Sequence, residues 1–202
     1  MPGTLLVYDT DFPRATTSRG ERIINRPTAA ELMDNHYPAP QRLLAIPSAL
    51  APEAYVALIL REMRAFIRSI DVLAIFGHGV VSSAATPGGI VPVTTGILLG
   101  ASPITQSSAS LLSTLRGHLA RHARCELWVC QAASRGTAGA SGLSGHNLCQ
   151  AIADALRVEV RASAIDQRTD TIGGAGTLES EIQFLPWEGE VETIRPSGRH
   201  GG

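Results

Sequence analysis

The sequence predicts an α/β protein, a three-layer α/β/α sandwich with a mainly parallel central sheet. Short apolar runs of strand length alternate with segments whose apolar residues recur at helical spacing. The run over residues 70–76 is apolar at six of its seven positions, which is typical of a strand buried on both faces of a parallel sheet. Parallel neighbours need crossover connections, so helices are expected on both faces of the sheet.

The first half of the chain starts with a buried strand at residues 4–8. Residues 12–50 are rich in Pro, Arg and Thr and show little periodicity, so we expect a long excursion with one short helix near 28–35. A helix is predicted over 52–67, because a proline stands at its first position and apolar residues follow at helical spacing. This helix leads directly into the strand at 70–76.

The middle of the chain is expected to be irregular. Residues 80–110 form a predicted loop-rich insertion, broken by one short strand-like run at 96–100. Ser107 or Ser108 can cap a following helix that carries leucines on one face. That helix is expected to lead into the next strand, at 126–130.

A small-residue loop, a helix over 146–156 and a strand over 158–162 are expected to follow. The rest of the chain, 170–202, is predicted to be a terminal hairpin, in which 181–185 pairs with 190–194, and a tail. The whole chain, 1–202, has the length of a single domain.

Composition excludes several classes of function. The net charge is −1, from 17 arginines and 18 acidic residues, so no global field favours nucleic acid or a membrane surface as a partner. No apolar run reaches the roughly 18 residues that span a bilayer, and the first residues lack the pattern of a secretory signal. We therefore expect a cytoplasmic protein, or one delivered outside the cell without a cleavable signal peptide.

Neither a metal nor another cofactor is expected. The three cysteines contain no C-x-x-C pair, which argues against a disulfide framework and a structural zinc site. Cys125 and Cys149 are interpreted as small buried structural thiols. His118 and His122 have the spacing of paired ligands on a helix, but the glutamate of a metalloprotease motif is missing between them.

Two predicted strands end in reactive side chains. The strand at 70–76 runs into Gly-His78-Gly79, and the strand at 126–130 ends in Cys130. If the two strands are parallel neighbours, the imidazole and the thiol lie at the same edge of the sheet, where open α/β sheets bind ligands. A histidine there can take the proton of the thiol, and the backbone N–H groups of Gly79 and Cys130 can form an oxyanion hole.

The blocks Val72-Leu-Ala-Ile-Phe-Gly-His78-Gly79 and Leu127-Trp-Val-Cys130-Gln-Ala resemble the two signature blocks of caspase-like cysteine peptidases. This group includes caspases, metacaspases, legumains, gingipains and bacterial toxin autoprocessing domains. The resemblance covers about residues 70–163. It implies a caspase-like fold and a bacterial type of cysteine endopeptidase, a thiol protease and hydrolase.

By this resemblance Cys130 is the nucleophile and His78 the general base or acid, with Gly79 in the oxyanion hole. The family's substrate pocket draws on the end of the first strand and on the loops after the nucleophile. Asp9, Asp11 and Ser134 stand at those places, and the two acidic residues could select an Arg or Lys by charge pairing. The expected partner is a protein or peptide substrate, or the chain itself.

Two alternatives stay open at this point. The first is a catalytically inactive caspase-like module for protein binding or assembly, with the excursion and the insertion as its partner surfaces. The second is a flavodoxin-like binder of small molecules that uses the same edge of the sheet. The second alternative has no phosphate-binding loop after the first strand, where Asp9 and Asp11 would repel an anion.

Overall fold

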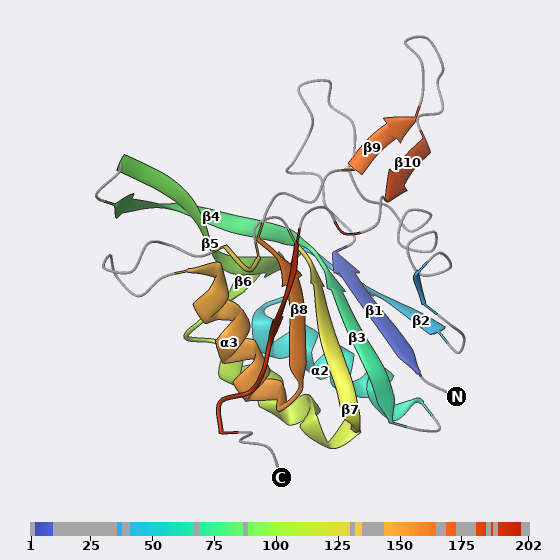
Figure 1. The fold of residues 1–202 in the computed structure, drawn as a ribbon. Coiled ribbons are helices and arrows are strands. Elements are labelled where there is room, and N and C mark those ends of the chain that lie inside the picture. Colours follow the sequence, from blue (N-terminus) through green and yellow to red (C-terminus); the bar gives the residue numbers. More distant parts are fainter. Residues whose placement is uncertain are drawn as a thin grey trace.

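The fold was analysed in a computed structural model (Figure 1). The described residues are 3–9, 36–37, 41–66, 69–86, 89–129, 132–134, 144–164, 169–172, 181–184, 187 and 190–198.

A six-stranded sheet forms the centre of the molecule, in the order β11–β8–β7–β3–β1–β2. Five of its strands are parallel, and only β11 at one edge is antiparallel. The strands are β1 (Thr4–Asp9), β2 (Gln41–Ile46), β3 (Ile70–Phe76), β7 (Leu119–Trp128), β8 (Glu159–Ser163) and β11 (Val191–Ile194). The predicted α/β class with a mainly parallel central sheet is confirmed.

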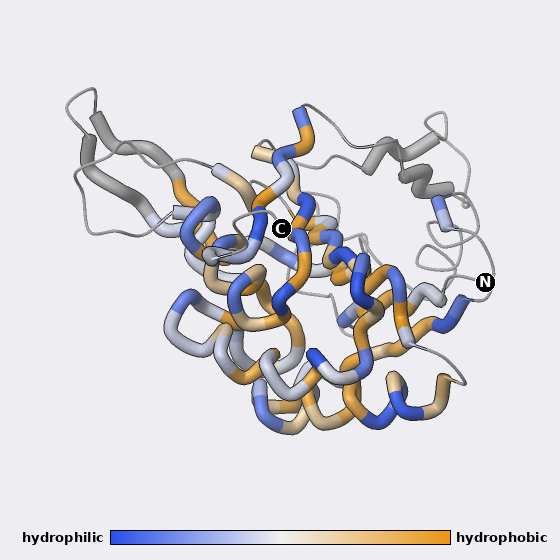
Figure 2. Tube along the Cα trace, turned by 60° about the horizontal axis from the view of Figure 1, so that its bottom comes forward, coloured by the Kyte–Doolittle hydropathy of each residue, from blue (hydrophilic) through white to orange (hydrophobic). Residues whose placement is uncertain are grey.

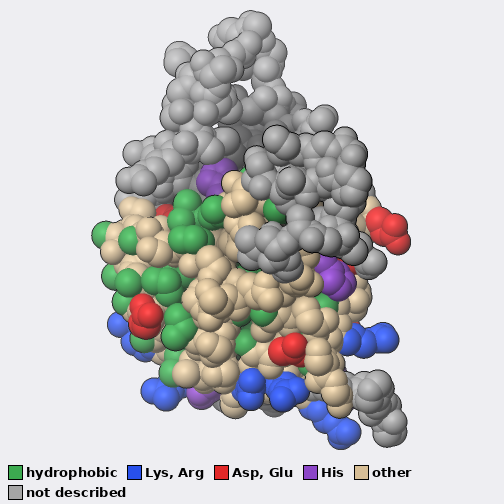
Figure 3. Space-filling view, turned by 90° about the vertical axis from the view of Figure 1, so that its left-hand side faces the viewer, with side chains coloured by type: hydrophobic (Ala, Val, Ile, Leu, Met, Phe, Trp, Pro, Cys, Tyr) green, Lys and Arg blue, Asp and Glu red, His purple; other side chains and the backbone are tan. Residues whose placement is uncertain are grey.

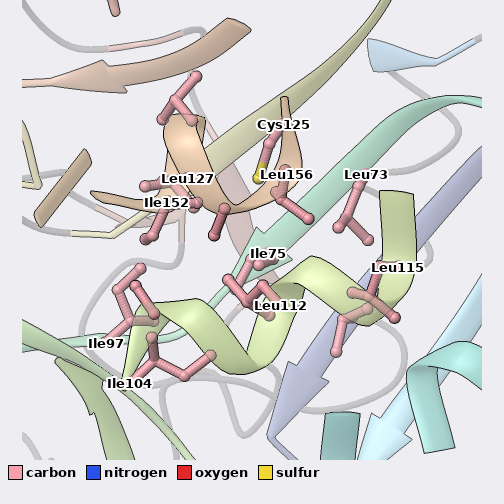
Figure 4. Close-up of a cluster of buried hydrophobic side chains, with 14 of the residues drawn as sticks. Leu73, Ile75, Ile97, Ile104, Leu112, Leu115, Cys125, Leu127, Ile152 and Leu156 are labelled. Carbon is pink, nitrogen blue, oxygen red and sulfur yellow. The ribbon is translucent and has the colours of Figure 1, made fainter. Parts of the chain in front are cut away.

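Three helices pack together on one face of this sheet: α2 (Pro52–Arg64), the 3₁₀ helix η1 (Ala109–His118) and α3 (Gly145–Leu156). η1 contacts both α2 and α3. Figure 4 shows the core between the layers, where Leu73 and Ile75 of β3 lie near Leu112 and Leu115 of η1. Apolar residues run along the central strands and the inner sides of the helices (Figure 2).

The opposite face of the sheet has its own apolar cluster, because alternate side chains of a strand point to opposite faces. It contains Leu6, Tyr8, Val72, Ala74, Phe76 and Trp128 from the strands, with Tyr37 packed against them. The central strands are therefore buried on both faces, as the apolar runs predict. In the described part of the chain, α2, η1 and α3 all lie on the first face, and Tyr37 and Trp187 cover the second. Among these residues, the prediction of helices on both faces is therefore met on one face only.

The ends of α2 and α3 follow from local sequence. Pro52 occupies the start of α2, where a missing N–H costs nothing. Ser144 caps α3 by accepting a hydrogen bond from the N–H of Asn147. Arg157 ends α3 in a left-handed conformation, φ 60°, with its N–H bonded to the carbonyl of Ala153.

The loop-rich insertion predicted for 80–110 is wrong. The chain there forms a three-stranded antiparallel sheet in the order β4–β5–β6, with β4 at His78–Thr86, β5 at Gly89–Leu99 and β6 at Ser102–Thr105. The β4–β5 hairpin extends away from the body of the molecule (Figure 1). Small and polar residues hide the strand alternation here, and Pro92 lies inside β5 rather than in a loop.

The excursion predicted for 12–50 contains a strand of the central sheet. Within it, β2 pairs in parallel with β1 and forms the sheet's edge. The strand is only half-buried, so its sequence lacks the fully apolar character of β1 and β3. The short helix predicted near 28–35 lies outside the described residues.

The helix expected after Ser108 is a 3₁₀ helix, and its cap differs from the prediction. Ser108 Oγ accepts a hydrogen bond from the N–H of Thr105, which precedes it, and makes no capping bond into η1. Leu119, the last of the leucines expected on this helix, instead starts β7. The strand predicted at 126–130 is correspondingly longer at its amino end.

The predicted terminal hairpin of 181–185 with 190–194 is also wrong. β10 (Glu181–Phe184) pairs with β9 (Thr169–Ile172), whereas β11 pairs with β8 in the central sheet. β11 buries Ile194 against the core. Within the described ranges, no helix is long and apolar enough to cross a membrane.

Candidate active site at the carboxyl edge of the central sheet

The two strands that carry the signature blocks are neighbours. β3 and β7 run parallel, and Phe76 lies opposite Trp128 at their carboxyl ends. The N–H of Gly77 also donates to the carbonyl of Trp128, at 3.4 Å. The chain therefore leaves both strands at the same edge, as predicted. His78 is two residues beyond Phe76, and Cys130, which lies outside the described residues, is two residues beyond Trp128.

His78 is held at this edge as the first residue of β4, with a half-buried side chain. Burial lowers the pKa of His78 to about 4, because water no longer solvates the imidazolium well. At neutral pH the imidazole is uncharged, which is the form that accepts a proton.

Gly77 makes the turn from β3 into β4 possible through a close approach of two backbones. A Cβ atom at this position would lie 2.8 Å from the carbonyl oxygen of Leu98 in β5. A side chain there would push the antiparallel sheet away from the central sheet. The requirement for a small residue before His78 is therefore steric.

Gly79 lies in β4 opposite Ile97. The carbonyl of Val80, the next residue, accepts a hydrogen bond from the Thr95 hydroxyl of β5 at 3.2 Å. The pairing shifts register between Val80 and Val81, because β5 has one extra residue there, Thr95. β4 itself keeps the alternation of a strand, so we expect the main-chain groups of Gly79 and Val81 to point away from β5. The role of Gly79 in an oxyanion hole stays a prediction, and this orientation leaves its N–H on the outer side.

The segment after Cys130 is fixed by backbone contacts. The N–H of Ala133 donates to the carbonyl of Ser163 at the end of β8, at 2.9 Å. The thiol of Cys149 in α3 donates to the carbonyl of Ala132, at 3.0 Å. Both alanines are fully buried.

Ser134 joins this segment to two further elements. Its Oγ accepts a hydrogen bond from the N–H of the buried Thr94 in β5, at 3.4 Å. Its carbonyl accepts from the N–H of His146 at the start of α3, at 3.1 Å. These contacts position the segment. The predicted place of Ser134 in a substrate pocket stays a prediction.

Asp9 ends β1, and its side chain links the central sheet to the three-stranded antiparallel sheet. Its side chain is buried, and its Oδ2 accepts a hydrogen bond from the N–H of Gly100 at 2.7 Å. Gly100 has φ +70°, and a Cβ there would lie 2.5 Å from the carbonyl of Leu50. Asp9 thus has a structural contact, and its role in a substrate pocket stays a prediction. Asp11 lies outside the described residues.

Sequence reasoning missed a polar network on the second face of the sheet, close to the candidate site. The Tyr37 hydroxyl donates to the buried Glu126 at 2.5 Å and accepts from the Trp128 indole N–H at 2.7 Å. Trp187 stacks on Trp128 with ring centroids 4.1 Å apart. Burial, and then the charge of Glu126, raise the pKa of Tyr37, so its hydroxyl remains a donor.

A signal for part of this network exists in the sequence. Glu126 is an acidic residue beside the apolar run of β7, and a carboxylate buried in a sheet needs hydrogen-bonding partners. Its partner Tyr37 comes from a segment without periodicity, so the pairing could not be predicted.

Two other predictions about titratable side chains have different outcomes. Cys125 and Cys149 are buried, as predicted, and burial raises the pKa of both thiols. His118 ends η1 whereas His122 is exposed in β7, so the helical spacing assumed for them does not apply.

On the face in Figure 3, arginine side chains gather at the lower end of the molecule, the end from which β7 starts in Figure 1.

The chain was compared with known proteins. No family model matches it, and no curated protein is significantly similar to it in sequence.

Proposed function

We propose that this protein is a cysteine endopeptidase of the caspase-like group, which cleaves a protein partner or itself through a dyad of Cys130 and His78. The register between β3 and β7 carries the proposal, because His78 and Cys130 each follow a residue of the pair Phe76 and Trp128 by two positions. The mainly parallel α/β sheet is consistent with a caspase-like sandwich.

The proposed reaction uses His78 in its neutral form, which its lowered pKa favours. His78 takes the proton of the Cys130 thiol while the sulfur attacks the carbonyl carbon of the scissile bond. The N–H groups of Gly79 and Cys130 stabilise the resulting oxyanion. His78 then protonates the leaving amine, and the C–N bond breaks to give a thioester.

Hydrolysis completes the proposed cycle. His78 removes a proton from a water molecule, which attacks the thioester carbonyl. The C–S bond breaks, the carboxylic acid product leaves, and the proton returns to the sulfur. The anchored segment Ala132–Ser134 supports this scheme, since it provides a fixed backbone at the carboxyl edge of the sheet where the proposed reaction takes place.

Incubation with a mixed peptide library, read by mass spectrometry, tests the proposal. We expect cleavage by the wild type and at least about a hundredfold slower cleavage by Cys130→Ala and His78→Gln. Cys125→Ala is the matched control, because it removes a thiol of the core and should retain cleavage if it folds. Equal cleavage by the wild type and Cys130→Ala would refute the proposal.

A second candidate is a catalytically inactive caspase-like module for protein binding or assembly. The observation that favours it is the long β4–β5 hairpin, which extends from the body and exposes the apolar side chain of Val81. A wild-type protein that cleaves no peptide in the library would favour this candidate over the peptidase.

A further inference from the structure

We propose that the outer edge of β4 binds an extended peptide, which adds to the antiparallel sheet as a further strand beside His78. The inference deepens the proposed function, on which it rests for the claim that this peptide is the substrate. It concerns how the main chain of the peptide is held, and it can be tested without turnover.

The free edge belongs to β4. In the described part of the chain, β4 pairs with β5 alone, whereas β5 lies between β4 and β6. The hydroxyl of Thr95, the extra residue of β5 at the bulge, donates to the carbonyl of Val80, which indicates that this carbonyl faces β5. The N–H and C=O groups of Gly79 and Val81 therefore face the outer side, where they can pair with another strand.

Of the features that usually prevent strand addition, this edge has a bulge in its pairing with β5, at the step from Val80 to Val81, but neither charge nor proline. Natural edge strands are protected by charged residues, by proline or by inward-pointing charges. None of the 44 residues from 72 to 115 is Asp, Glu, Lys or Arg, and β4 itself has no proline. Val81 is 51% exposed, which makes it the large apolar side chain most open to solvent on this strand.

An extended peptide fits this edge better than a charged or helical partner. An uncharged edge offers main-chain hydrogen bonds and one apolar contact, which is how sheets recognise added strands. Gly79 and Val81 are two residues apart, so their outward groups match the roughly 6.6 Å repeat of an extended chain.

The position of the edge also favours a peptide that is to be cleaved. β4 begins at His78, so a strand that pairs with Gly79 and Val81 would lie directly beside the proposed general base. A carbonyl of that strand would meet the outward N–H of Gly79, the group assigned to the oxyanion hole. Binding and chemistry would then share one continuous strand edge.

Proline at position 81 removes one outward donor. Because the N–H of Val81 points away from β5, Val81→Pro leaves the β4–β5 ladder intact, and proline is tolerated at such edge positions. Val81→Ala is the matched control, since it shortens the same side chain and keeps the N–H. Both changes are made in Cys130→Ala, so that binding is measured without cleavage, and chemical unfolding verifies that each variant is folded.

The probe is a mixed library of octapeptides, and the tightest binder is then measured by calorimetry. We expect Val81→Pro to weaken its binding about tenfold and Val81→Ala by less than about threefold. The same peptide N-methylated at alternate amides provides a second test that does not alter the protein. Methylation of one set of alternate amides should weaken the binding of the peptide about tenfold, and methylation of the other set should change its binding little.

Several results would overturn the inference: no peptide binding to Cys130→Ala, equal binding by folded Val81→Pro, or equal effects of both methylation patterns. The free protein could also form a dimer that Val81→Pro converts to monomer while peptide binding stays unchanged. That result would assign the edge to a second copy of the chain. If the wild type cleaves a peptide and Val81→Pro, with Cys130 intact, cleaves it with the same KM, the inference is refuted and the proposed peptidase is not. Peptide binding that depends on Val81 without any cleavage would instead refute the peptidase.

Discussion

His78 should make the stability of the folded chain depend on pH in the acidic range. Burial lowers the pKa of His78 to about 4, against 6.5 for an ordinary histidine. Below pH 6.5 the unfolded chain takes up a proton at this position, and the folded chain does not until the pH approaches 4. The unfolded state therefore gains free energy as the pH falls through this window, and the folded state becomes less stable.

The size of the effect follows from the same two values. At 1.36 kcal/mol per pH unit, they set an upper limit of about 3 kcal/mol on the loss in the free energy of unfolding between pH 6.5 and pH 4, and solvent around the half-buried side chain reduces it below that limit. This loss is absent in His78→Gln, which keeps a polar side chain but cannot be protonated. At pH 7 the His78 proton contributes only about 0.2 kcal/mol to the difference between the two proteins.

The assay is urea unfolding of the wild type and His78→Gln at a series of pH values. Subtracting the two curves removes the contribution of other groups, among them His36, whose pKa burial also lowers. A difference that grows in favour of His78→Gln as the pH falls from 6.5 would support the reasoning. Parallel curves, or an NMR titration of His78 with a pKa near 6.5, would refute it.

Two further predictions concern packing and the buried network. Gly77→Ala should destabilise the fold by about 1–3 kcal/mol, because the new Cβ meets the carbonyl of Leu98 in β5. Gly117→Ala is the control and should change stability little, because a Cβ there has nothing within 4 Å. Thermal unfolding compares the two variants, and equal effects would contradict the steric account. Tyr37→Phe should cost about 1–3 kcal/mol because it removes the donor from Oε2 of the buried Glu126, whose Oε1 stays paired with Arg124. Tyr55→Phe is the control, since its hydroxyl makes one 3.4 Å bond to a backbone carbonyl and should lose less; a larger loss for Tyr55→Phe would count against the network.

The part of the fold that could be predicted is the part with long apolar runs or clear caps. β1 and β3 are largely apolar strands, α2 begins at Pro52, and α3 follows from its apolar residues at helical spacing. The position of His78 at the tip of a strand, beside the strand that precedes Cys130, also follows from these runs.

The rest depended on contacts between residues far apart in the sequence. β2 is a half-buried edge strand, and β11 is fixed only by its pairing with β8. β4 and β5 are built of small, uncharged residues whose alternation is weak, so glycine and proline suggested a loop. The bond from Asp9 to Gly100 joins residues 91 positions apart, which no local pattern can indicate.

Alkylation of the three cysteines tests the central claim most directly. Iodoacetamide is added to the native wild type and to His78→Gln, and modified peptides are followed by mass spectrometry. Cys125 and Cys149 are buried thiols with raised pKa values, so they should react only after unfolding. The account predicts that Cys130 is modified first, and more slowly in His78→Gln. Modification of Cys130 at the same rate in both proteins, or no faster than that of Cys125 and Cys149, would contradict the proposed dyad.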